Sequence, residues 1–134
     1  MVQSVCILGR QPALGLAELE SLYAAEAVSV VAPSVAGLTL DHTAIDFSRL
    51  GGSTRLASVI GEVPSVNFKQ VEKALIGLTD STAFTLPASG KFHLGLSAYG
   101  FDISPAKLNA LGLTLKKFCA RAMRVPSGWC QTMT

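Results

Sequence analysis

The residues best suited to chemistry are basic side chains near the end of the chain. Lys117, Arg121 and Arg124 follow one another at spacings of four and three residues, which places them on one side of a helix. Such a row of cations can contact the phosphates of a polyanion, and each phosphate contact adds roughly 0.7 to 0.9 to the log–log slope of affinity against salt. The alternative interpretation is a solvated face whose cations stabilise the C-terminal end of the helix.

The distribution of charge favours the first interpretation. The net charge of the 134 residues is +2, but residues 1–80 carry eight acids and five bases, whereas residues 81–134 carry one acid and six bases. The two parts therefore have net charges of −3 and +5, and this asymmetry predicts that the C-terminal part faces a polyanion. The candidate RNA-binding residues are Lys91, Lys107, Lys116, Lys117, Arg121 and Arg124.

Residues with catalytic or metal-binding chemistry are few and poorly spaced. Cys6, Cys119 and Cys130 have neither CxxC nor Cys/His spacing, which argues against a metal site and a disulfide framework. Neither His42 nor His93 has a partner at ligand spacing, and no glycine-rich phosphate loop follows a predicted strand. We expect no catalytic, cofactor-binding or metal site, and the chain alone is not expected to be an enzyme.

The composition is apolar for a soluble monomer. Apolar residues make up 49% of the chain, charged residues 15%, and the mean hydropathy is +0.44, whereas about 25% charged residues is typical. No run reaches the roughly 18 apolar residues of a membrane span, and the N-terminus does not have the form of a signal peptide. We expect a cytoplasmic protein, with no membrane partner, whose apolar face is covered by another part of the polypeptide or by a second copy.

Residues 1–63 alternate between strand-like and helix-like segments. In chain order these are a buried strand at 5–9, a helix at 15–26, hairpin strands at 27–32 and 36–42, a short helix at 42–50 and a strand at 53–63. We expect Gly15 at the cap of the first helix, with Glu18 as the acidic member of a weakened capping box. The order β-α-β-β-α-β is that of the ferredoxin-like unit.

The following residues predict a helix at 68–78, a loop at 79–90, a strand at 91–99 and a helix at 104–122. Ser104 as cap and Pro105 in the first turn mark the start of the last helix. Its expected buried side comprises Leu108, Leu111, Leu115, Phe118 and Cys119. Gly112 costs about 1 kcal/mol relative to Ala, so two shorter helical pieces are an alternative.

Three stretches together resemble one family. They are ILGRQPALGLAELESL, DFSRLGGSTRLASVIGEV, and KFHLGLSAYG followed by KLNALGLTLKKFCARAMR, and they span about residues 7–124. In this order they are similar to the N-terminal region of THUMP-domain RNA methyltransferases, in particular those that methylate the exocyclic amine of guanosine in tRNA. In that family a ferredoxin-like domain and a THUMP domain grip tRNA near its acceptor end, and a separate methyltransferase domain uses S-adenosylmethionine.

The resemblance implies an α+β chain with a ferredoxin-like βαββαβ unit at 1–63 and a partial THUMP-like α/β segment at 64–134. Lys116, Lys117 and Arg121 match the basic helix of the family and are the residues expected to face RNA, while Arg124 begins the next strand. The implied partner is tRNA or another structured RNA.

The chain departs from the family at its C-terminal end. The tail WCQTMT does not match the continuation of THUMP, and neither an Asp/Asn-Pro-Pro-aromatic motif nor a cofactor-binding glycine motif is present. We therefore expect the catalytic half to be absent from this chain, with S-adenosylmethionine bound only by that half. A shortened THUMP segment would leave apolar strand edges open, which predicts a homodimer or strand exchange between chains.

Two other functions stay open. One is a ferredoxin-like homo-oligomerisation module that does not bind RNA and whose basic helix is only solvated. The other is a small-ligand regulatory domain, for which Gly9 and Gly15 at the first strand–helix turn are the only support.

Overall fold

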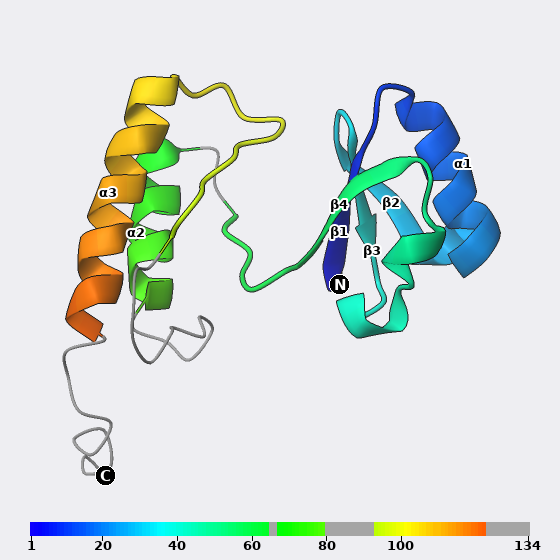
Figure 1. The fold of residues 1–134 in the computed structure, drawn as a ribbon, viewed down its shortest axis with the longest axis horizontal. Coiled ribbons are helices and arrows are strands. Elements are labelled where there is room, and N and C mark those ends of the chain that lie inside the picture. The colour runs from blue at the N-terminus through cyan, green and yellow to red at the C-terminus, as the bar shows by residue number, and fades with distance from the viewer. Residues whose placement is uncertain (65–66, 80–92, 123–134) are drawn as a thin grey trace, which may run out of the picture. The chain divides into compact units, whose positions relative to one another are not determined.

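The computed structural model describes residues 1–64, 67–79 and 93–122 (Figure 1). The chain divides into two compact units. The first, called here the sheet unit, comprises residues 1–62 and 98–101, and the second, the helix unit, comprises residues 63–97 and 102–134. Strands and α-helices both occur among the described residues, which confirms the mixed α+β class.

An antiparallel sheet forms the centre of the sheet unit. Its strands are β1 Ser4–Leu8, β2 Val28–Ala32, β3 Val35–Leu38 and β4 Ser53–Ser58. Their order is β2-β3-β1-β4, so the first strand of the chain lies inside the sheet, and β2 and β4 form its edges. The strands predicted in this region all form, although β3 and β4 end earlier than predicted.

Helix α1, Pro12–Tyr23, packs along one face of this sheet (Figure 1). The predicted start at Gly15 is wrong, because Pro12 occupies the first turn, where its missing N–H and fixed φ angle suit a helix. Gly15 lies inside the helix and is buried. The predicted capping box is also wrong, since Glu18 bonds to a distant segment described below.

The helix predicted at 42–50 is replaced by two 3₁₀ turns, His42–Ala44 and Phe47–Arg49. An aspartate precedes each turn, and the carboxylates of Asp41 and Asp46 each accept the backbone N–H two residues later, at 2.9 and 3.2 Å. These local bonds compete with the i to i−4 bonds of an α-helix, which explains why two short turns form instead.

The core of the sheet unit lies between α1, the sheet and these turns. Cys6 and Leu19 are fully buried within it, and Cys6 lies in the strand that was predicted to be buried. The buried core residues are Cys6, Leu8, Leu19, Ala36, Leu38, Ile45 and Leu50.

The described helices of the helix unit are α2, Phe68–Thr79, and α3, Pro105–Ala122, which pack side by side (Figure 1). The hydroxyl of Ser104 accepts the backbone N–H of Lys107 at 3.4 Å, which confirms the predicted cap. Helix α3 continues through Gly112, so the alternative of two shorter pieces is wrong. Leu111, Leu115 and Cys119 form its buried seam, as predicted.

The strand predicted at 91–99 does not form in the described part of that range. Residues 93–98 have no regular secondary structure, although Leu94 and Leu96 are half-buried while His93, Gly95 and Ser97 are exposed. The alternation of a strand is therefore present, but a strand also needs a neighbour with which to exchange hydrogen bonds. Lys91, the loop residues 80–90, Arg124 and Cys130 lie outside the described residues.

Candidate nucleic-acid interface

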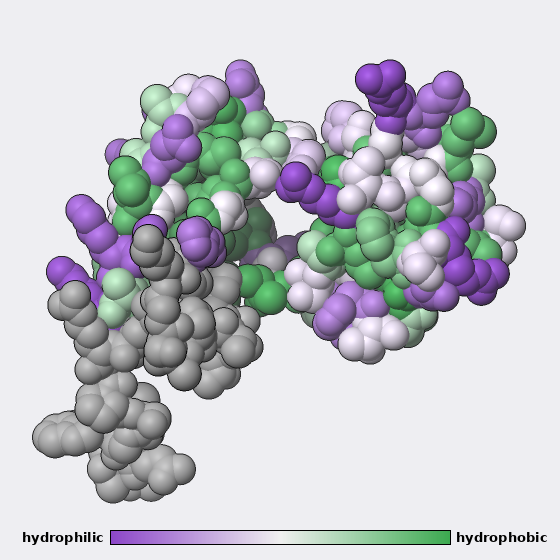
Figure 2. All heavy atoms as spheres, viewed as in Figure 1, coloured by the Kyte–Doolittle hydropathy of each residue, from purple (hydrophilic) through white to green (hydrophobic). Residues whose placement is uncertain are grey.

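The exposed cations of α3 form the strongest candidate site. They are Lys107, Lys116, Lys117 and Arg121, called here the α3 cations, and no acidic residue occurs between Pro105 and Ala122. Because the buried seam fixes which side of the helix packs, all four side chains are exposed to solvent. Figure 2 shows hydrophilic side chains along the outer border of α3.

The α3 cations do not share one face. At about 100° per residue, Lys117 and Arg121 lie about 40° apart on the side away from Leu115, with a rise of roughly 6 Å between them. By the same geometry, Lys107 and Lys116 lie on opposite flanks, roughly 80° and 100° to either side of Leu115. One flat surface can therefore contact Lys117 and Arg121 together, but it cannot contact all four cations equally.

Arg121 also contacts an aromatic ring of its own helix. Its guanidinium carbon lies 5.9 Å from the centre of the Phe118 ring, within the range of a cation–π interaction. This contact limits the freedom of the Arg121 side chain, so less conformational entropy is lost when its planar donor group binds an anion.

A shallow hollow lies beside Lys116. It has a volume of about 520 Å³ and lies between α3 and the segment Leu94–Leu96, with Asn109, Gly112 and Leu113 in its lining. Leu113 is 65% exposed, so the hollow combines an apolar wall with a cation at its border. The ammonium group of Lys116 is therefore accessible to solvent and to any molecule bound against residues 94–96.

Two further cations lie on α2 and are not among the candidates predicted from the sequence. Lys69 and Lys73 are exposed and four residues apart, so they share one side of that helix. Their i, i+4 spacing was a detectable signal, but both residues lie before residue 80 and so fall in the part of the chain with a net charge of −3. Divided by unit instead, the helix unit has eight bases and three acids, net +5, and the sheet unit has three bases and six acids, net −3.

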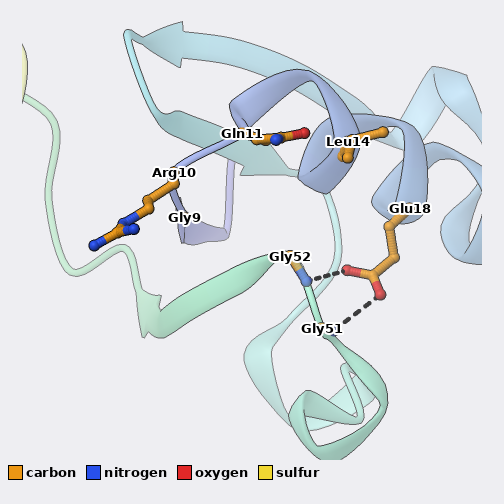
Figure 3. A pocket seen from close by; sticks show the side chains of 7 residues that line it. All are labelled: Gly9, Arg10, Gln11, Leu14, Glu18, Gly51 and Gly52. Atoms are coloured by element: carbon orange, nitrogen blue, oxygen red, sulfur yellow. Dashed lines mark hydrogen bonds between the residues drawn. The ribbon is translucent and has the colours of Figure 1, made fainter.

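A second hollow, of about 440 Å³, lies in the sheet unit and is lined by Gly9, Arg10, Gln11, Leu14, Glu18, Gly51 and Gly52. The carboxylate of Glu18 accepts the backbone N–H groups of Gly51 and Gly52 at 2.9 and 2.8 Å (Figure 3). These two bonds lower the pKa of Glu18 below its ordinary value. Arg10 points away from this carboxylate (Figure 3). The two amides that could bind an anionic ligand already bind the carboxylate of Glu18 from α1.

The cysteine and histidine residues show no arrangement typical of catalysis among the described residues. Burial raises the pKa of the Cys6 thiol, which opposes formation of a nucleophilic thiolate. Nδ1 of His42 lies 3.4 Å from the carboxylate of its neighbour Asp41 on the surface. No group of three or more metal-ligating side chains occurs in the described ranges.

Comparison with known proteins gave no relative. No family model matches the chain, and neither the curated proteins nor the solved structures contain a match. Within residues 1–64, 67–79 and 93–122, no helix is long and apolar enough to cross a membrane.

Proposed function

We propose that this chain is a non-catalytic RNA-binding module that positions tRNA, or another structured RNA, for a methyltransferase domain. The observation that carries the proposal is the segregation of charge: the helix unit has a net charge of +5 and exposes Lys117 and Arg121 side by side on α3. A basic surface of this kind is the electrostatic footprint of a protein that contacts phosphates.

The resemblance to THUMP-domain methyltransferases is the reason for proposing tRNA as the class of RNA and the cytoplasm as the location. The sheet unit supports it through its element order, in which a helix follows the first strand and a hairpin follows the helix, as in a ferredoxin-like unit. In this proposal the two 3₁₀ turns take the place of the second ferredoxin-like helix, and the helix unit corresponds to the start of THUMP. S-adenosylmethionine would bind only to the methyltransferase domain.

The proposal is tested by titrating labelled tRNA with the chain at about 50 and 200 mM salt. A chain that contacts several phosphates is expected to lose roughly tenfold or more in affinity over this range. In the double variant Lys117→Gln/Arg121→Gln, the log–log slope against salt should fall by roughly 1.4 to 1.8, because two phosphate contacts are lost.

A matched control removes the same amount of charge from the sheet unit. Arg49 and Arg55 are exposed, so Arg49→Gln/Arg55→Gln changes the net charge of the chain as much as the first variant does. This control should leave the slope unchanged. Equal effects of both variants would mean that only net charge matters, and RNA binding by the first variant at parental strength would refute the assignment of the two residues.

A further inference from the structure

Strand β2 is an edge of the sheet that carries no charged residue of its own. Its register with β3 shifts once, between Val30 and Ala32, and Gly100 lies against its last residue, Ala32, so the open part of the edge is Val28–Val31. Natural edge strands carry charges or proline that discourage pairing with other chains. The opposite edge, β4, has the exposed Arg55, whereas β2 has the sequence VSVVA and no charge. Val30 and Val31 on β2 are 68% and 56% exposed.

The exposed valines make both faces of this edge apolar. Val31 lies over Gly37 of β3, where an added Cβ would be only 2.7 Å from the Val31 side chain. Val30 pairs with Ala36, the neighbour of Gly37 on β3, and therefore points to the opposite face. A strand that paired with β2 would cover backbone donors and acceptors and would meet an apolar side chain on each face.

The helix unit contains a segment that suits such a pairing. Residues 93–97 belong to this unit and alternate between exposed and half-buried positions, as a strand does, and Leu94 and Leu96 line the hollow against α3. Ala98, which follows, is exposed and is the first residue of the part that belongs to the sheet unit. Within the described part of the chain, the backbone of this segment forms no hydrogen bond. One side of the segment therefore packs near α3, and its backbone N–H and C=O groups can still form hydrogen bonds with another strand.

We propose that residues 93–98 of one copy pair with the β2 edge of a second copy, giving a reciprocal homodimer. Charge complementarity favours a second copy as the occupant, because β2 belongs to a unit of net charge −3 and residues 93–97 belong to a unit of net charge +5. The local charges agree, since the exposed Glu26 lies just before β2 and Lys116 lies beside Leu94–Leu96. Each chain offers both partners of the pairing, so two copies can satisfy each other.

The test is the mass of the full chain in solution, measured by light scattering and by sedimentation over a range of concentrations. The wild type should be a dimer that weakens as salt screens the opposite charges. Val30→Lys puts a charge on the β2 edge, and Ser97→Pro/Ala98→Pro removes adjacent N–H groups that point to both sides of the segment. Both variants should lose the dimer and keep the circular dichroism spectrum of the parent. Ser58→Lys, on the exposed end of β4, is the matched control and should remain dimeric.

Mixing the two monomeric variants gives the sharpest result. The Val30→Lys chain still offers residues 93–98, and the proline variant still offers an intact β2, so the mixture should form a heterodimer with one pairing. A wild type that stays monomeric at every concentration would overturn the proposal. A proline variant that stays dimeric would also overturn it, because the occupant of β2 would then be another segment, such as the β2 of the partner.

Discussion

Replacing Gly15 by Ala tests the close contact between α1 and the segment that leads into β4. In most helices this change stabilises the protein by about 1 kcal/mol, because Ala has the higher helix propensity. Here an added Cβ would lie 2.8 Å from the carbonyl oxygen of Gly52 and 3.1 Å from Cδ2 of Leu8. The backbone oxygen cannot turn aside as a flexible side chain can, so the helix must shift.

The magnitude follows from two opposing terms. Forcing an extra carbon into a filled space costs typically about 1 to 3 kcal/mol, and the propensity gain returns about 1 kcal/mol. The net result is a destabilisation of up to about 2 kcal/mol. At Gly77 of α2, no atom of the described residues outside the local helix backbone would lie within 4 Å of an added Cβ, so Gly77→Ala should realise the whole gain of about 1 kcal/mol.

Hydrogen–deuterium exchange resolved by segment measures both effects, because it reports the opening free energy of each unit separately. Amides of α1 and β1 should exchange faster in Gly15→Ala, and amides of α2 should exchange more slowly in Gly77→Ala. Gly52→Ala should reproduce the first effect, since its Cβ would lie 2.5 Å from Cα of Gly15. Slower exchange of α1 in Gly15→Ala would refute the contact between the two glycines.

Two further predictions concern a carboxylate and a leucine pair. The bonds that Glu18 accepts from the amides of Gly51 and Gly52 hold its pKa below the ordinary value in the folded chain. Glu18 therefore stabilises the fold above its unfolded pKa, and this contribution is lost as the pH falls through the folded pKa. Urea unfolding of wild type and Glu18→Gln between about pH 3 and 7 should show a difference at neutral pH that vanishes in acid, and a difference independent of pH would contradict it. Leu115→Ala in the buried seam of α3 should destabilise the helix unit by about 2 to 5 kcal/mol, while Leu113→Ala, at a 65% exposed position, should change it by no more than about 0.5 kcal/mol; exchange of α2 and α3 amides distinguishes the two.

The features that the sequence predicted well are local ones. The periods of two and of about 3.6 residues located β1 and the helices α2 and α3, and Ser104 with Pro105 marked the start of α3. The helix predicted at 42–50 failed for an equally local reason, because Asp41 and Asp46 each close a short turn. An Asp two residues before a Thr or Ser was a readable signal for such turns.

The features that it could not predict depend on residues far apart in the chain. Glu18 bonds to amides 33 and 34 residues away, and nothing in its local sequence distinguishes it from a solvated helix acid. Gly15 was predicted to be a helix cap from its local sequence. Its actual role, a close contact with Gly52, is set by the packing of α1 on the sheet and cannot be read from neighbouring residues. The strand at 91–99 failed in its described part because alternation predicts which side chains face inward and does not supply a partner strand.

The proposed RNA interface and the proposed dimer should both weaken as salt rises, so a salt titration alone does not distinguish them. They use different atoms, however. The proposed RNA binding would depend on side-chain charges of Lys117 and Arg121 on the outer side of α3, whereas the proposed strand pairing would depend on backbone groups of residues 93–98 and on the apolar edge of β2. Lys116 is the residue common to both, because it lies on the flank of α3 and lines the hollow against Leu94–Leu96. A partner sheet unit placed there would bring acidic residues toward Lys116 and leave Lys117 and Arg121 free, since these point away from the seam. The variants at Lys117 and Arg121 should therefore weaken RNA binding without changing the mass of the protein, and Val30→Lys should change the mass while leaving these two cations in place.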